Sequence, residues 1–362
     1  MLQEVRAVRK AAARGNFEHL PKVSSYALVK FGADPEAFFE NEKGLIVGSE
    51  LVIPKILKGD TASVVRDGVQ LEIHLSPSHC REQFAANLEE SFYLLANHLE
   101  EKNKERVKLS FKAVVRVTEG QINRLSPKSR LLGCAPSVNI YDDTAKVGVN
   151  PETYRVRSAG GHVHLGLSSR HLKDEFRRII RMCDILLGNQ CVLLDREPLM
   201  KLRRRVYGRA GECRVQPYGV EYRTLSNFWL RSEPLMSFVL AMARNAVQVI
   251  ATTDGVSGAG KPWNAEKAMF DYIKLPDIVK AINNNDFDLA MKNYEGIEQF
   301  ILKHFDEDHD GLNAMNTTKF KKFAIAVNDK GIEKFFKHDA YNYWNENRTY
   351  DGWESYIAKV KV

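Results

Sequence analysis

Hydrophobic and polar residues alternate most clearly at residues 160–167, which read GGHVHLGL. Val163, Leu165 and Leu167 occupy every second position, and two histidines lie between the apolar residues or just before them. Because successive side chains of a strand point to opposite faces, this pattern predicts a strand with one apolar face and one face that carries both imidazoles. A single buried histidine is commonly a core residue, whereas two on one face beside glycines favour metal or anion chemistry.

Three further predicted strands carry two polar residues at alternate positions. The pairs are Asp34 with Glu36, Glu72 with His74, and Glu221 with Arg223. Pro35 disfavours helix at the residue before it, so it favours an extended geometry for the first pair. Taken singly, the first pair also fits a turn and the second fits a solvated strand face, so neither pair decides a function alone.

Helical periodicity dominates two other parts of the chain. One predicted helix begins at Ser76–Pro77 and a second spans Leu172–Leu187, and from residue 232 onward the pattern is helical almost throughout. The sequence therefore predicts an α+β fold, with a mostly antiparallel sheet backed by helices. The predicted divisions are a basic N-terminal helix at 1–22, a catalytic domain at 23–231 and a helical C-terminal region at 232–362.

The composition narrows the class of protein and the kind of partner. The chain has 362 residues, a formal net charge of +7 and a pI near 9.0, which favours partners with phosphate or carboxylate groups. No uninterrupted apolar run approaches the ~18–20 residues that span a bilayer, so no membrane is expected as a partner. The five cysteines include no CxxC pair and are expected to be free thiols, which predicts a cytoplasmic location.

The four polar pairs together predict a metal centre. Side chains at alternate positions of a strand lie about 6.5–7 Å apart on one face, close enough to share an ion. If the strands adjoin, at least four carboxylates gather with imidazoles and an arginine, and such a gathering requires cations. Oxygen ligands outnumber nitrogen ligands, which favours magnesium or manganese over zinc. The neighbouring arginine-rich stretch, residues 201–214, adds the groups expected around the phosphates of a nucleoside triphosphate.

The order of these motifs resembles the glutamine synthetase superfamily. The stretches Gly32–Glu36, Gly161–His164 and Gly219–Arg223 look closest to the type-2 carboxylate–amine ligases of phages. The resemblance covers residues 26–230 and implies an antiparallel sheet that forms an open funnel, with metal ions on its concave face. The helical C-terminal region has no counterpart in it, so it does not imply glutamate and ammonia as substrates.

The resemblance also implies roles for individual residues. Ligands of a first metal would be Glu36 and Glu72, with Asp67 beside them, and ligands of a second would be Asp34, His162 and Glu221. His164 would lie near the acidic substrate or the nucleotide, and Arg209 is placed with it in nucleotide binding. Arg214 and Arg223 would hold the transferred phosphoryl group and the substrate carboxylate, and they form the catalytic set with Glu221. His74 receives no role.

The function expected from the sequence is an ATP-dependent ligase that joins a carboxylate substrate to an amine through an acyl phosphate. Its cofactors would be ATP and Mg²⁺ or Mn²⁺, and its location would be the host cytoplasm if a phage encodes it. The sequence is compatible with a homo-oligomer. Three other functions also fit: a kinase for a guanidino group on the same fold, a nucleic-acid-binding protein that uses Arg203–Arg214, and a mononuclear iron or zinc enzyme that uses His162, His164 and Glu221.

Overall fold

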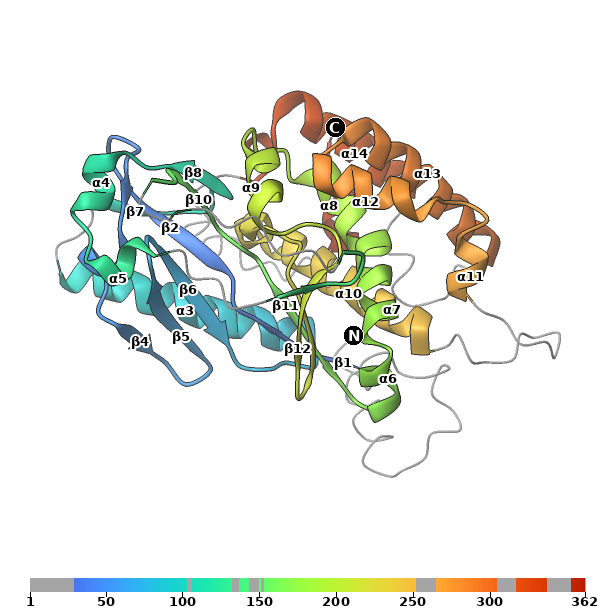
Figure 1. The fold of residues 1–362 in the computed structure, drawn as a ribbon, viewed down its shortest axis with the longest axis horizontal. Helices are drawn as coiled ribbons and strands as arrows, with labels where there is room; N and C mark the ends of the chain where they lie inside the picture. Colours follow the sequence, from blue (N-terminus) through green and yellow to red (C-terminus); the bar gives the residue numbers. More distant parts are fainter. Residues whose placement is uncertain are drawn as a thin grey trace.

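The fold combines antiparallel sheets with helices, as the sequence predicts (Figure 1). It is seen in a computed structural model, which describes residues 29–102, 106–131, 137–142, 150, 153–251, 265–304, 317–336 and 353–361. The predicted basic helix at 1–22 lies outside the described residues, as does Cys134. The other four cysteines are free thiols in the structure, as expected.

A five-stranded sheet, which we call the histidine sheet, runs through the middle of the molecule. Its order is β1 (Val29–Ala33), β11 (Val163–Leu167), β13 (Gly219–Tyr222), β12 (Glu212–Gln216) and β9 (Val138–Asn139). The alternation predicted for β11 is confirmed, because its apolar residues are buried and His164 is partly exposed on the other face. The apolar face packs against helices α7 (Phe176–Cys183) and α10 (Glu233–Ala251).

A second sheet lies beside it, and one helix covers it. Its order is β3 (Ile46–Val47), β2 (Glu36–Asn41), β6 (Gln70–Leu75), β5 (Ala62–Asp67) and β4 (Ile56–Lys58), and β7 (Val107–Ser110) also pairs with β2. A tight turn at Asp67–Gly68 joins β5 to β6, since Asp67 pairs with Gln70 and Gly68 has a φ of 61°. Strands β8 (Val114–Arg116) and β10 (Val156–Ser158) form a separate pair.

The helix over the second sheet begins later than the sequence suggests. Helix α3 spans Arg81–Glu101 and packs on β4, β5 and β6, whereas the sequence predicts a start at Ser76–Pro77. The intervening residues stay extended because Ser78 exchanges two backbone hydrogen bonds with Phe31, each 2.7 Å long. Tertiary pairing with β1 therefore overrides the local helix signal.

The helix predicted at Leu172–Leu187 is present as a series of shorter helical segments. They are α6 (Arg170–Asp174), α7, a π-helical turn (Asp184–Gly188) and α8 (Asn189–Leu194). The remaining short helical segments before residue 232 are η1 (Ser49–Leu51), α4 (Glu119–Asn123), α5 (Pro127–Arg130), α9 (Met200–Val206) and η3 (Asn227–Arg231).

The described part of residues 232–362 is helical, as predicted. Its helices are α10, α11 (Ala265–Met269), α12 (Leu275–Asn284), α13 (Phe287–His304), α14 (Thr317–Lys330), η5 (Ile332–Lys334) and α16 (Trp353–Lys359). Phe238 of α10 lies against the rings of Phe320 and Trp353, so this region shares its core with the helices behind the histidine sheet.

Helix α10 is the one described helix with the length and hydropathy of a membrane span. It has 19 residues and a mean hydropathy of 1.4 over the tested window, despite Arg244 within it. The helix was not apparent from uninterrupted apolar runs. Of that window, 78% is buried inside the protein, which is also the behaviour of a core helix.

The two sheets meet where the chain passes from β1 to β2 through Asp34 and Pro35. At this junction the backbone N–H of Glu36 donates to the carbonyl of Gly160 at 2.8 Å, and Gly160 forms an isolated bridge with Ser226. The Asn227 side chain donates to the carbonyl of Glu36 at 2.8 Å. Segments distant in sequence are thus joined at the end of β11 that carries His162.

Gly161→Ala is expected to lower the free energy of unfolding by ~2–3 kcal/mol, because its Cβ would overlap the Ser226 backbone carbonyl and the Trp229 indole nitrogen. Gly120→Ala is the matched control, since nothing lies within 4 Å of its Cβ position on helix α4. Urea unfolding of both variants measures the difference. Equal stability of the two variants would show that the close approach at Gly161 is not required.

Candidate metal and phosphate site

The strand register places polar residues of three strands in one row, next to a glycine of a fourth strand. Gly32 of β1 lies opposite His164, His164 lies opposite Glu221, and Glu221 lies opposite Arg214 of β12. Side chains directly opposite each other on neighbouring antiparallel strands share a face. Gly32 leaves that face open beside His164, whose Cβ would be 3.4 Å from a Cβ at Gly32. The predicted polar face is therefore real, and it lies opposite the helices.

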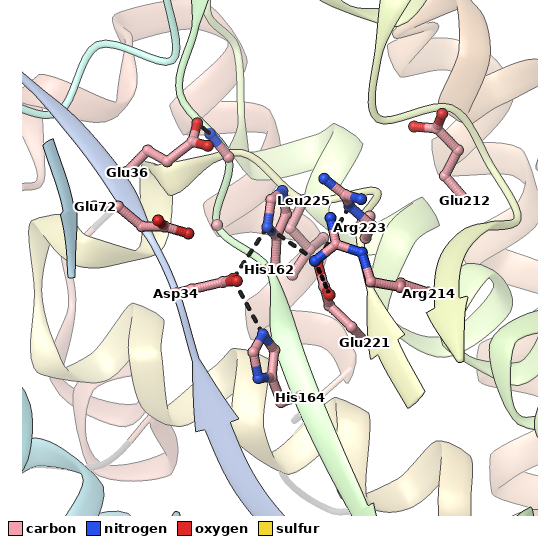
Figure 2. A network of polar contacts seen from close by, with 12 residues as sticks. Asp34, Glu36, Glu72, His162, His164, Glu212, Arg214, Glu221, Arg223 and Leu225 are labelled. Carbon is pink, nitrogen blue, oxygen red and sulfur yellow. Dashed lines mark hydrogen bonds and ion pairs between the residues drawn. The ribbon is translucent and has the colours of Figure 1, made fainter. Parts of the chain in front are cut away.

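Asp34 lies between the two histidines (Figure 2). Its Oδ1 atom is 3.0 Å from His162 Nδ1 and 3.1 Å from His164 Nε2. Burial alone would raise the pKa of Asp34, but the charge and hydrogen bonds of His162, joined by those of His164, outweigh burial and hold the pKa well below its ordinary value. Asp34 is therefore a carboxylate at neutral pH.

Glu221 is fully buried and has three positively polarised neighbours. Arg214 Nη1 donates to its Oε2 at 3.0 Å, and Arg223 Nε and His162 Nδ1 lie 3.1 and 3.3 Å from its Oε1. Arg223 itself is almost fully buried, whereas Arg214 keeps about a quarter of its side chain exposed. A buried carboxylate requires such partners, because an unpaired one would cost several kcal/mol in desolvation. Of the two arginines, Arg214 is therefore the more accessible to a ligand.

Asp34, His164 and Glu221 fit a divalent metal ion. Each offers one ligand atom, and these atoms lie within 4.8 Å of one another. Glu221 Oε1 and His164 Nε2 are buried and have no geometrically aligned hydrogen bond, although charged groups lie close to both. Two carboxylates with one imidazole form a donor set suited to magnesium or manganese.

The structure brings both histidines to the carboxylates and does not separate their expected roles, since His162 Nδ1 also lies 3.3 Å from Glu221 Oε1. The resemblance assigns His162 to the metal and His164 to the nucleotide or acidic substrate. In the structure both rings contact Asp34, and the group at ligand spacing contains His164.

The first predicted metal site forms an acidic cluster on the side of β2 and β6. Glu36 lies opposite Glu72 in the strand register, and Glu36 Oε2 accepts hydrogen bonds from the Gly160 backbone at 2.6 Å and from Gln70 at 3.3 Å. Burial, and then the charge of Asp67, raises the pKa of Glu36 well above its ordinary value. Burial, followed by the charges of Glu72 and Asp34, raises the pKa of Asp67 to about 6.

This acidic cluster is electrostatically part of the same site, because the charge of Asp34 contributes to the raised pKa values of Glu36 and Asp67. Its carboxylates do not reach the ligand spacing of the Asp34 group within the described residues. His74 lies 3.0 Å from Glu72, whose hydrogen bond raises the pKa of His74. His74, to which the sequence assigned no role, is therefore a partner of Glu72.

The arginine-rich stretch divides into buried and exposed residues. Arg203 and Arg204 are buried and donate to backbone carbonyls, including that of Thr224, so they support the loop after β13. The guanidinium of Arg209 lies 3.8 Å from Asp142 and not beside the carboxylates of the site, so the structure does not bring it to the expected position. The buried pair is unavailable to a phosphate backbone, which weakens the nucleic-acid hypothesis.

The site also contains two tyrosines, and the sequence patterns did not predict either of them as a site residue. The hydroxyl of Tyr207 contacts His162 and Arg223, and the hydroxyl of Tyr218 lies 3.1 Å from His164 Nδ1. Tyr207 follows helix α9 and Tyr218 lies in the turn between β12 and β13, so no strand alternation marks either of them. The only sequence evidence for these two tyrosines was their position close to arginines along the chain.

Comparisons with known proteins agree with the family suggested by the motifs. Residues 142–260 match a protein-family model described as phage phiEco32-like COOH.NH2 ligase-type 2. The resemblance to this family is confirmed over that segment. The segment holds both histidines, Arg214, Glu221 and Arg223, whereas Asp34 and the acidic cluster precede it.

Two other comparisons give no further support for a family or a function. A search of curated proteins finds no match. Among solved structures, the chain is similar to a bifunctional glutathione synthetase from Pasteurella multocida, with a TM-score of 0.36 and 12% identity. The similarity covers 92% of this chain and 52% of that structure, so the chain spans about half the length of this neighbour. A likeness at this level supports no argument about the site.

Metal-free protein is expected to lose stability as the pH rises from about 4 to about 6, because the folded state holds the Asp67 proton up to a pKa of about 6 and the unfolded state releases it near 3.8. The loss of stability above pH 6 is on the order of 3 kcal/mol. Asp67→Asn should flatten the slope, and the exposed Asp271→Asn should not. Urea unfolding in EDTA between pH 4 and 7.5 measures the pH dependence of the free energy of unfolding. An identical pH dependence for wild type and Asp67→Asn would contradict this electrostatic origin.

Proposed function

We propose that the protein is an ATP-dependent carboxylate–amine ligase that forms an amide bond through an acyl phosphate. The observation that carries the proposal is the group formed by Asp34, His164 and Glu221, together with the ion pairs of Glu221 to Arg214 and Arg223. Ligand groups for a cation and donors for phosphate oxygens thus lie on adjacent strands. The match of residues 142–260 to a ligase family supports the same reaction class.

The proposed reaction has two steps. A carboxylate oxygen of the substrate attacks the γ-phosphorus of ATP, and the bond to ADP breaks, which gives an acyl phosphate. The nitrogen of the amine then attacks the acyl carbon, inorganic phosphate leaves, and the nitrogen loses a proton. Both steps depend mainly on positioning and on neutralising the charge that builds up on oxygen atoms.

The positions of the residues indicate which would bind metal and which would bind phosphate. Asp34, His164 and Glu221 would hold a divalent ion, and Glu36, Glu72 and Asp67 supply a further acidic surface for a second ion. The metal would supply charge neutralisation and orientation of the triphosphate. Arg214, because it is partly exposed, would donate to the transferred phosphoryl group. Arg223 is buried against Glu221 and Tyr207, so it would hold Glu221 in place and complete the positive side of the site.

The kinase hypothesis uses the same site and differs only in the acceptor. A guanidino kinase would transfer phosphate to nitrogen and release no inorganic phosphate, whereas a ligase forms one phosphate per amide. The mononuclear iron or zinc hypothesis is less well supported, because Asp34 joins the group and makes oxygen ligands the majority. The proposal includes an open funnel formed by the antiparallel sheet and a cytoplasmic location.

Purified protein with Mg²⁺ and ATP is expected to release phosphate only when an acid and an amine are both present, and hydroxylamine in place of the amine should trap the acyl phosphate as a hydroxamate. Glu221→Gln should lower kcat by about 100-fold or more, because it removes a ligand charge of the site. Val220→Ala is the control from the same strand: it is buried on the apolar face, so it should keep kcat and lose ~2 kcal/mol of stability.

Two results would contradict the proposal. Full activity of folded Glu221→Gln would show that the strand face is not catalytic. Activity that needs stoichiometric zinc or iron and is indifferent to magnesium would show that the metal assignment is wrong.

A further inference from the structure

Strands β8 and β10 pack against helix α9 (Figure 1). Val156 of β10 lies opposite Arg116 of β8, so these two residues share a face of the strand pair. Val114 and Val156 form a buried cluster with Met200 of α9, and Tyr154 packs against this cluster. The face that meets α9 therefore continues into Arg116, whose side chain is exposed.

Helix α9 presents two further cations to solvent. Lys201 and Arg205 are exposed, whereas Arg203 and Arg204 between them are buried. Residues four apart on a helix have Cβ atoms about 5–6 Å apart, and like charges at this spacing destabilise the helix. Within the part of the chain that the structure describes, no carboxylate forms an ion pair with Lys201, Arg205 or Arg116. The protein therefore maintains a surface of unpaired positive charge, which we call the basic surface.

The arginines of the basic surface lie close to the hydroxyl of Tyr154. Burial raises the pKa of Tyr154, and the charges of Arg116, Arg157 and Arg205 act in the opposite direction. Arg157 is almost fully buried, and its Nη1 donates to the carbonyl of Tyr154 at 2.5 Å. Burial lowers the pKa of Arg157, and the charge of Arg155 lowers it further. Positive charge thus comes both from the surface and from the layer beneath it.

The basic surface adjoins the proposed site. Arg205 precedes Tyr207 by two residues, so their Cα atoms are at most ~7 Å apart, and the hydroxyl of Tyr207 contacts His162. Strand β10 likewise leads through Gly160 into the strand that carries His162. A chain bound on the basic surface would therefore lie within a few residues' length of the metal site.

We propose that Arg116, Lys201 and Arg205 form a docking surface for an acidic peptide segment that carries the carboxylate substrate. Carboxylates at alternate positions of an extended peptide lie about 6.5–7 Å apart, which is close to the spacing of Lys201 and Arg205 on their helix face. The role of the segment as a substrate rests on the proposed function. Its binding to the basic surface requires neither ATP nor a metal, so the two proposals have separate measurements.

A peptide fits the basic surface better than a nucleic acid does. Proteins that hold a single nucleic-acid strand usually combine phosphate contacts with base stacking on aromatic rings. Tyr154 is the aromatic residue beside these cations, and part of its ring is already used in packing against the valine cluster. A phosphodiester backbone also contains no carboxylate for the proposed reaction.

Binding of a fluorescein-labelled hexaglutamate peptide to the full chain, followed by fluorescence anisotropy without ATP or metal, tests the docking surface. Wild type should bind hexaglutamate at least about 10-fold more tightly than hexaglutamine, and added salt should weaken the binding, because the contacts are between exposed charges.

Charge-reversal variants locate the binding. Lys201→Glu combined with Arg205→Glu should weaken hexaglutamate binding by about 10-fold or more. Lys55→Glu combined with Lys58→Glu is the matched control, because it changes the net charge equally at exposed residues of the β4 edge and should weaken binding by about twofold at most. Arg116→Gln, on a separate strand, should weaken binding about threefold and tests the surface even if the α9 variant does not fold.

Turnover separates docking from chemistry. With an acidic peptide as the acid, the Lys201→Glu and Arg205→Glu double variant should raise KM about 10-fold and leave kcat within about twofold of wild type, because neither residue is among the metal and phosphate groups of the site. A lowered kcat with an unchanged KM would show that these residues do not dock the substrate.

Three binding results would overturn the proposal: no hexaglutamate binding by wild type, equal weakening in the β4 control, or tighter binding of an oligothymidine of equal charge, which would make the surface a nucleic-acid site. Hexaglutamate binding that depends on Lys201 and Arg205, in a protein without any ATP-dependent ligase activity, would uphold the docking surface and contradict the proposed function.

Discussion

The buried carboxylate of Glu221 is the constraint on which the centre of this structure depends. It lies on the third strand of the histidine sheet with no exposed surface, so its charge must be balanced by groups the protein itself provides. Arg214 comes from the neighbouring strand, and Arg223 follows Glu221 by two residues on the same face. The same carboxylate that would bind a cation therefore also fixes the arginines that would meet phosphate.

Close backbone packing brings the other half of the site to this carboxylate. Gly160 exchanges hydrogen bonds with Glu36, and Gly161 lies against the backbone of Ser226, so β2, the β10–β11 connection and the loop after β13 approach one another closely. A Cβ on Gly160 would also overlap the ring of His162. The double glycine is thus a packing requirement of the junction, and the junction is what places Asp34 between the two histidines.

Sequence alternation predicted the strands and their polar faces because it depends only on which side each residue points to. For β11, β6 and β13 this was enough to select His164, Glu72 and Glu221. The resemblance to a ligase family was likewise predicted, and the match over residues 142–260 confirms the resemblance for that segment. The sequence could not show which ring nitrogen faces Asp34, because that depends on Tyr207 and Tyr218, which lie outside regular strands.

Local signals failed where long-range pairing decided the outcome. The serine and proline before α3 are good helix starters, yet Ser78 pairs with β1 and delays the helix to Arg81. The density of charge in the arginine-rich stretch suggested a set of phosphate-binding residues. In the structure, Arg203 and Arg204 donate to backbone carbonyls inside the protein, and Arg209 lies beside Asp142. Only the folded arrangement distinguishes an arginine that supports a loop from one that can meet a ligand.

The central claim is a metal centre formed by Asp34, His164 and Glu221, and anomalous diffraction tests it most directly. Crystals grown with Mn²⁺ and a non-hydrolysable ATP analogue should show a manganese peak about 2.0–2.6 Å from oxygen atoms of Asp34 and Glu221 and from His164 Nε2, with the phosphates on the Arg214 side. Manganese bound away from both Asp34 and Glu221 would contradict it.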